Sequence, residues 1–171
     1  KEARLEALQL ELQEARNPKA QQFPLQTNLP SVTVRLRVIA ASNLIDLGEE
    51  KQPYVLSELV DVVSGALISN TEVFRTENIN SSLRTHRVDT VWNTPEFVWS
   101  GVSTDIENIV LRVNVYGCGT EDHAISADVH EAIGGVKIPL WEGLLSEEWH
   151  FLSAIDKMDR HATGSIHLRL F

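Results

Sequence analysis

The sequence predicts an all-β fold, an eight-stranded antiparallel β-sandwich preceded by an N-terminal α-helix. From Val32 onward, short stretches alternate apolar and polar residues with a period of two, which is the pattern of strands with one buried and one solvated face. Turn-forming sequences such as Ser64-Gly65 and residues 78–82 (NINSS) separate these stretches. Helical periodicity is almost absent after residue 31. About eight short strands joined by turns are typical of two packed antiparallel sheets.

The composition argues against several classes of function. Of the 171 residues, 43% are hydrophobic and 23% are charged, as in ordinary globular domains. The net charge of −9 provides no positive field for phosphate, so we expect no nucleic-acid partner. The one cysteine, Cys118, has no partner for an internal disulfide, which favours a reducing compartment. We expect an intracellular protein that is cytoplasmic, cytoskeleton-associated or membrane-peripheral.

Residues 1–16 (KEARLEALQLELQEAR) lack Gly and Pro and consist almost entirely of strong helix formers. Apolar residues recur with the spacing of the a and d positions of a coiled coil. They form a seam of Leu5, Leu8, Leu12 and Ala15. We therefore expect the end of an upstream coiled coil, a homodimer, and a fragment of a longer polypeptide. The alternative is a single amphipathic helix that lies on the following domain or frays, because so short a helix is marginal in water.

Residues 17–31 are predicted to link this helix to a β-domain at residues 32–171. Asn17-Pro18 stops the helix, and three prolines without periodicity indicate an extended segment. In the first strand, residues 32–40, the apolar face is predicted to carry Val32, Val34, Leu36, Val38 and Ala40. Its other face carries Thr33, Arg35 and Arg37.

The remaining candidate strands follow the same pattern over residues 54–63, 66–74, 84–92, 96–102, 109–116, 132–140, 149–152 and 165–171. The four tryptophans lie in or beside these stretches, and we interpret most of them as core residues. They are Trp92, Trp99, Trp141 and Trp149.

Seven segments resemble, in the right order, successive parts of a C2 domain over residues 32–171. They are VRLRVIAASNL, QPYV, RTHRVDTVWNTPEFVW, LRVNVY, AIGGVKIPL, EEWHFL and GSIHLRLF. The connection at residues 64–83 is longer than the usual one in this family, and carries either a partner site or nothing. The resemblance implies a β-sandwich whose first and third loops lie at the same end.

The resemblance also implies where calcium ligands would stand. Calcium-dependent members use five acidic ligands, and the matching positions here are Asp46, Gln52, Gly117, Gly119 and Glu131. Two carboxylates of five remain, whereas calcium takes about six to eight oxygens. We therefore expect a calcium-independent domain with no cofactor. The long loop 117–135 contains other candidate metal ligands at Glu121, Asp122, His123, Asp128, His130 and Glu131. Zinc bound by two histidines and a carboxylate is one interpretation, and a solvated acidic loop is the simpler one.

A basic face is the candidate for binding acidic phospholipids, because the loop end is acidic and would repel anionic headgroups. Its residues are Arg35, Arg37, Arg84, His86 and Arg87. The period of two sends Arg84 and His86 to one face and Arg87 to the other. Ordinary solvated sheet residues are the alternative interpretation.

We expect no enzyme activity, because Cys118 lies in an acidic loop and lacks the positive surroundings that activate a thiol nucleophile, and no phosphate-binding glycine loop is present. Two functions remain. The first is a non-catalytic scaffold module that binds protein partners in a cytoskeletal or ciliary-type assembly, a resemblance of architecture. The second is a peripheral-membrane tether that binds acidic phospholipids through the basic face.

The seam predicts weak dimerisation through the helix. Each leucine buried at the interface contributes roughly 1.5–3 kcal/mol before the entropy of association is subtracted. We expect light scattering to show a dimer at micromolar or higher concentration, and the double variant Leu5→Glu/Leu12→Glu to weaken it. A dimer that this variant leaves unweakened would place the main interface on the β-domain, and a strict monomer would favour the single-helix alternative.

Overall fold

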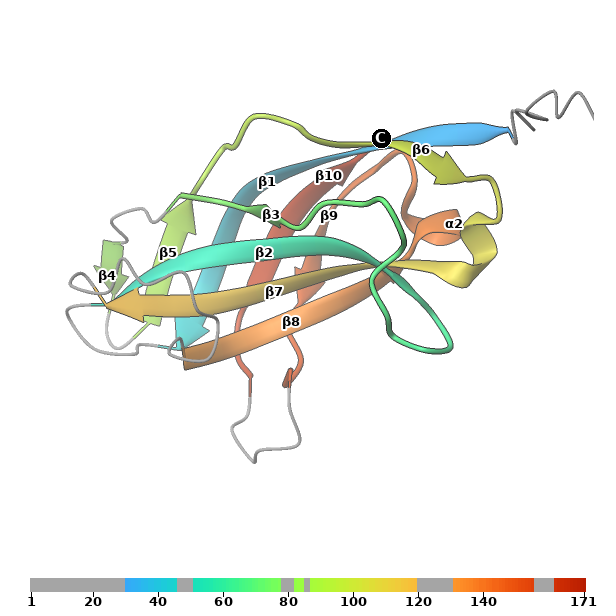
Figure 1. Ribbon diagram of the computed structural model, residues 1–171. Coiled ribbons are helices and arrows are strands. Elements are labelled where there is room, and N and C mark those ends of the chain that lie inside the picture. The colour runs from blue at the N-terminus through green and yellow to red at the C-terminus, as the bar shows by residue number, and fades with distance from the viewer. Residues whose placement is uncertain (1–29, 46–50, 78–81, 85–86, 120–130, 156–161) are drawn as a thin grey trace, which may run out of the picture.

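The computed structural model describes residues 30–45, 51–77, 82–84, 87–119, 131–155 and 162–171 (Figure 1). The predicted coiled-coil seam at Leu5, Leu8, Leu12 and Ala15 lies outside these residues. Within them the chain forms two packed antiparallel sheets, which confirms the predicted sandwich. These sheets contain ten strands, not eight, because a further strand at residues 82–84 precedes the one at residues 87–91, and a two-residue strand adds to the second sheet.

Sheet A has six strands in the order β4-β5-β1-β10-β9, with β6 also paired to β1. Their bounds are Ser31–Ile45 for β1, Ser82–Arg84 for β4, Arg87–Val91 for β5, Phe97–Ser103 for β6, Ser146–Phe151 for β9 and Ser165–Leu170 for β10. The long β1 pairs with β6 along its first half and with β5 along its second half, while β10 pairs along its other edge.

Sheet B has the order β3-β2-β7-β8. Its strands are Lys51–Asp61 for β2, Phe74–Arg75 for β3, Ile109–Gly119 for β7 and Glu131–Pro139 for β8. The two described helices are single short turns, η1 at Ile106–Asn108 and α2 at Leu140–Gly143. No helix in the described part of the chain is long and apolar enough to cross a bilayer.

A β-bulge at Ile39 changes which residues of β1 face the core. Val34, Leu36 and Val38 are buried as predicted, but the register with β10 shifts between Val38 and Ala40. Ala41, not the predicted Ala40, is the next buried residue. The prediction for Ala40 was wrong because a strict period of two fails wherever one strand gains an extra residue.

The predicted strand at residues 66–74 is wrong. Only a bridge from Leu67 to Val60 and the short β3 pair with the sheet there. Asn70 has a φ of 62°, and Thr71 donates its backbone N–H and its hydroxyl to the Ile68 carbonyl, so the chain turns instead of extending. The segment still packs on the sandwich, because Trp99 donates its indole N–H to the Glu72 carbonyl at 2.7 Å.

The tryptophans divide evenly between core and surface. Trp92 and Trp99 are buried among the aliphatic residues of both sheets, as predicted. Trp141 and Trp149 are about half exposed, so the core interpretation was wrong for them. Their positions explain the difference: Trp141 lies on α2, and Trp149 lies on β9, an end strand of sheet A.

Thr94 completes the hydrogen bonding beside the bulge in β1. Its hydroxyl accepts the Val38 N–H at 3.1 Å, and its own N–H donates to the Val38 carbonyl at 3.1 Å. Replacing it by valine would leave a buried N–H unpaired, which costs about 1–3 kcal/mol. We expect Thr94→Val to lower the melting temperature by several degrees and Thr94→Ser, which keeps the hydroxyl, to lower it much less. Equal melting temperatures for the two variants would contradict this role for Thr94.

Candidate functional site

Four of the five positions that match calcium ligands meet at one end of sheet B. Gln52 of β2 pairs with Cys118 of β7. The neighbours of that cysteine are Gly117 and Gly119, and Gly117 pairs with Glu131 of β8. Together these four positions offer one carboxylate and one carboxamide. Among the described residues, no group of three or more His, Cys, Asp or Glu is placed to hold a metal.

Asp46, the fifth position, lies outside the described residues. So do the candidate zinc ligands Glu121, Asp122, His123, Asp128 and His130.

Aromatic packing occupies the outer surface of sheet B beside this end. Tyr54 and Tyr116 stack with ring centroids 5.6 Å apart, and the Arg75 guanidinium lies 4.0 Å from the Tyr54 ring centroid. Burial raises the pKa of Tyr54, against the opposing effect of the Arg75 charge, so its phenol stays protonated at neutral pH. Cys118 lies in β7 and not in the predicted loop, because this strand continues to Gly119. It is also buried, which suits a packing role better than a reactive one.

The structure does not gather the predicted basic residues into one cluster. Arg35 and Arg37 lie near the start of β1, beside β6. Arg87 pairs with Ile45 at the other end of β1, and Arg84 pairs with Arg87 in the β4–β5 hairpin. Eight residues of extended strand separate Arg37 from Ile45, which is roughly 26 Å. His86 lies outside the described residues.

Arg35 and Arg37 instead belong to a set of charged and aromatic residues on the outer surface of sheet A. We call this set the Arg–Trp face, and it consists of Arg35, Arg37, Glu96, Glu147, Trp149, His167 and Arg169. Strand pairing aligns it: Arg37 lies opposite Arg169, and His167 lies opposite Trp149.

Each glutamate of the Arg–Trp face contacts two basic side chains. Glu96 lies 3.8 Å from the Arg35 guanidinium and 3.5 Å from that of Arg37. Glu147 lies 3.5 Å from His167 and 3.5 Å from Arg169. The three arginines and two glutamates of the face together carry a single net positive charge. Such exposed pairs add little stability, but they neutralise the field of the arginines at short range.

The same face presents an aromatic surface. Trp149 stacks on His167 with ring centroids 4.8 Å apart and remains 50% exposed. Sequence analysis missed Arg169, His167 and Trp149 as site residues. A signal was present, because the alternation in SIHLRLF places His167 and Arg169 on the polar face of their strand. Their proximity to Arg37 depends on strand order, which the alternation does not contain.

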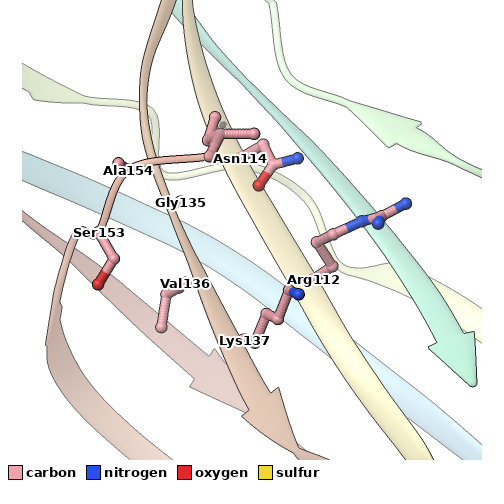
Figure 2. A pocket seen from close by; sticks show the side chains of 8 residues that line it. Arg112, Asn114, Gly135, Val136, Lys137, Ser153 and Ala154 are labelled. Carbon is pink, nitrogen blue, oxygen red and sulfur yellow. The ribbon is translucent and has the colours of Figure 1, made fainter. Parts of the chain in front are cut away.

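A concave region lies on the outer surface of sheet B, between β7, β8 and the segment after β9 (Figure 2). Its volume is about 530 Å³, and it is lined by Arg112, Asn114, Gly135, Val136, Lys137, Ser153, Ala154 and Ile155. Arg112 is paired with Glu58 at 2.7 Å. Glycine at position 135 allows a close approach to Asn114, because a Cβ there would overlap the Asn114 carboxamide oxygen. None of the described residues that line the pocket is a carboxylate, a histidine or a cysteine.

Solved structures with a similar fold include C2 domains. The first C2 domain (domain A) of plant Extended Synaptotagmin 1 matches with a TM-score of 0.55 and 18% identity, over 81% of this chain and 91% of that one. The calcium-bound pair of C2 domains, A and B, of Extended-Synaptotagmin 2 matches with a TM-score of 0.55 and 17% identity, over 82% of this chain and 45% of that one. A structure of CC2D1B matches with a TM-score of 0.55 and 12% identity, over 85% of this chain and 56% of that one.

The described residues therefore have the fold of a C2 domain, as the sequence resemblance implied. The chain spans about half of the length of the second and third of these structures. No protein-family model and no curated protein matches the sequence.

From the residues at the calcium-ligand positions we expect millimolar calcium to leave the melting temperature nearly unchanged. A ligand at a hundred times its Kd adds about 2.7 kcal/mol of stability, which for a domain of this size raises the melting temperature by several degrees. We expect no such rise, because the described ligand positions offer one carboxylate. A rise of several degrees that disappears in Asp46→Ala would show that a calcium site exists.

Proposed function

We propose that the chain is a non-catalytic, calcium-independent interaction module that binds a protein partner through the Arg–Trp face. In this proposal the module works inside the cell, carried on the coiled coil predicted at residues 1–16, as part of a scaffold of the cytoskeletal or ciliary type. The observation that carries the proposal is the combination on one face of a half-exposed tryptophan and three arginines whose charges are mostly neutralised.

Side-chain chemistry favours a protein over a membrane as the partner. Tryptophan and arginine are the residues most enriched at the energetic centres of protein interfaces, where they combine large contact area with directional hydrogen bonds. A surface that binds anionic lipid needs unneutralised cations, at about 1 kcal/mol per Lys or Arg near the headgroups. Here Glu96 and Glu147 each lie between two basic side chains. The second candidate is the membrane tether, whose basic residues are Arg35, Arg37, Arg84, His86 and Arg87. It requires Arg35 and Arg37 to bind lipid separately from the residues of the β4–β5 hairpin.

Co-sedimentation with vesicles rich in phosphatidylserine separates the two candidates. We expect the wild-type chain to stay in the supernatant at physiological salt, with and without calcium. The variant Glu96→Gln/Glu147→Gln, which removes the neutralising charges, should gain binding that falls as salt rises. Wild-type binding that disappears in Arg35→Glu/Arg37→Glu/Arg84→Glu would support the tether instead.

Site-directed photo-cross-linking in cells tests the protein partner directly. Val98 pairs with Arg35 across β6 and β1 and is 40% exposed, so a photoreactive side chain there would lie beside the Arg–Trp face. We expect a discrete protein adduct from position 98 that Arg37→Ala removes. The matched control is position 63, an exposed valine in the turn after β2. Identical adducts from both positions, or an adduct insensitive to Arg37→Ala, would contradict the proposed face.

A further inference from the structure

β9 has an outer edge that no other described strand covers. It is the end strand of sheet A, and it pairs with β10 through six consecutive residues without a register shift. Proteins usually protect such an edge with proline, charged side chains such as lysine, a bulge or a covering segment. The sequence of β9, SEEWHF, has two glutamates but no proline, lysine or glycine, and its pairing with β10 shows no bulge. Its backbone is therefore regular and suited to pair with a further strand.

The backbone groups that face this edge can be identified from the pairing with β10. Leu152, directly after β9, donates its N–H to the Gly164 carbonyl at 3.0 Å, so its backbone groups point toward β10. In an antiparallel ladder this direction alternates from residue to residue. The N–H and C=O groups of Glu147, Trp149 and Phe151 therefore point away from β10, toward the open edge.

Exposed apolar side chains accompany these groups. Trp149 is 50% exposed and Phe151 is 86% exposed. Leu145, which directly precedes β9, is 87% exposed in a left-handed conformation with a φ of 64°. An exposed, regular and partly apolar edge strand is a surface for pairing with another strand.

We propose that β9 pairs antiparallel with β9 of a second copy of this chain, in the register that places Trp149 opposite the partner's Trp149. In this register Glu147 lies opposite the partner's Phe151, so the backbone groups of all three outward-facing residues form hydrogen bonds with the partner. No other two-fold register within β9 pairs all three. It joins the six-stranded sheets of the two copies into one sheet.

Side-chain hydrogen bonding and charge repulsion favour the same register. With Trp149 at the centre, Glu148 lies opposite the partner's His150, and the contact occurs twice. With Glu148 at the centre, two glutamates would lie directly opposite each other, which is destabilising. Glu148 is exposed on β9, so its carboxylate is accessible to the partner. Burial lowers the pKa of His150 against the opposing effect of Glu148, so the imidazole is neutral at pH 7 and donates an N–H to the partner's carboxylate.

This inference goes beyond the proposed function, because it concerns the edge of sheet A and not its face. The two are also tested separately, since neither Glu148 nor His150 belongs to the Arg–Trp face. A coiled coil at residues 1–16 would hold two copies close together and raise the effective concentration for this contact. The interface itself is small, so we expect it to be weak without the helix.

Sedimentation velocity over a concentration series tests the pairing, with the full chain carrying Leu5→Glu/Leu12→Glu so that the helix does not contribute. We expect a weak, reversible dimer in this background. His150→Glu should raise the dimer dissociation constant about tenfold, because it places glutamate opposite glutamate at two places. The double variant Glu148→Lys/His150→Glu should recover much of the loss, since it places lysine opposite glutamate.

The rescue distinguishes the register from a general effect of surface charge. Melting temperatures measured at a concentration where all variants are monomeric serve as the control for folding. A strict monomer at the highest concentration would overturn the proposal. So would a dimer that His150→Glu leaves unweakened, or one that it weakens without recovery in the double variant.

Discussion

The β-bulge at Ile39 is the constraint on which the arrangement of sheet A depends. One edge of β1 pairs with β6 up to Leu36 and with β5 from Ala40, so a single strand serves two partners in succession. Trp92 and Asn93 both donate backbone N–H groups to the Ile39 carbonyl, and Thr94 closes the ladder at Val38. The extra residue increases the local twist and bend of the strand, which lets one long strand follow both parts of the sheet.

The bulge also determines which side chains reach the outer surface. Before it, Arg35 and Arg37 face outward, and after it Ala40 faces outward beside His167. Without the extra residue the second half of the strand would present the opposite set of side chains, because the side-chain period is two. Because of the bulge, Ala40 and not Ile39 lies opposite His167 of the Arg–Trp face.

A feature could be predicted from the sequence when the residues that form it lie close together in the chain. The alternation in residues 109–116 and 165–171 is local, and it correctly predicted β7 and β10. The turn at Asn70 and the bulge at Ile39 depend on hydrogen bonds to distant segments or on a left-handed residue, and the period of two contains neither. The pairing of Arg37 with Arg169 joins residues 132 positions apart in the chain, so strand order alone creates it.

The tryptophans show the same limit at the candidate site. Trp99 and Trp149 both lie in alternating stretches, and hydrophobicity gives them equal reason to be buried. Trp99 lies on β6 and reaches the core, where its indole N–H is satisfied by Glu72. Trp149 lies on an end strand whose outward side chains have no second layer above them in the described residues. The exposed site residue became recognisable only when the edge of the sheet was known.

The area that a stable interface requires relates the Arg–Trp face to the open edge of β9. A stable protein complex buries about 800 Å² on each partner, contributed by about 20–30 residues. The Arg–Trp face has seven members, and it ends at β9 because the sheet ends there. Pairing of two β9 strands would set a second Arg–Trp face beside the first, with Trp149 and the partner's Trp149 at the junction. A partner that contacts both copies would gain the area that a single sheet lacks, and its affinity would then depend on dimerisation.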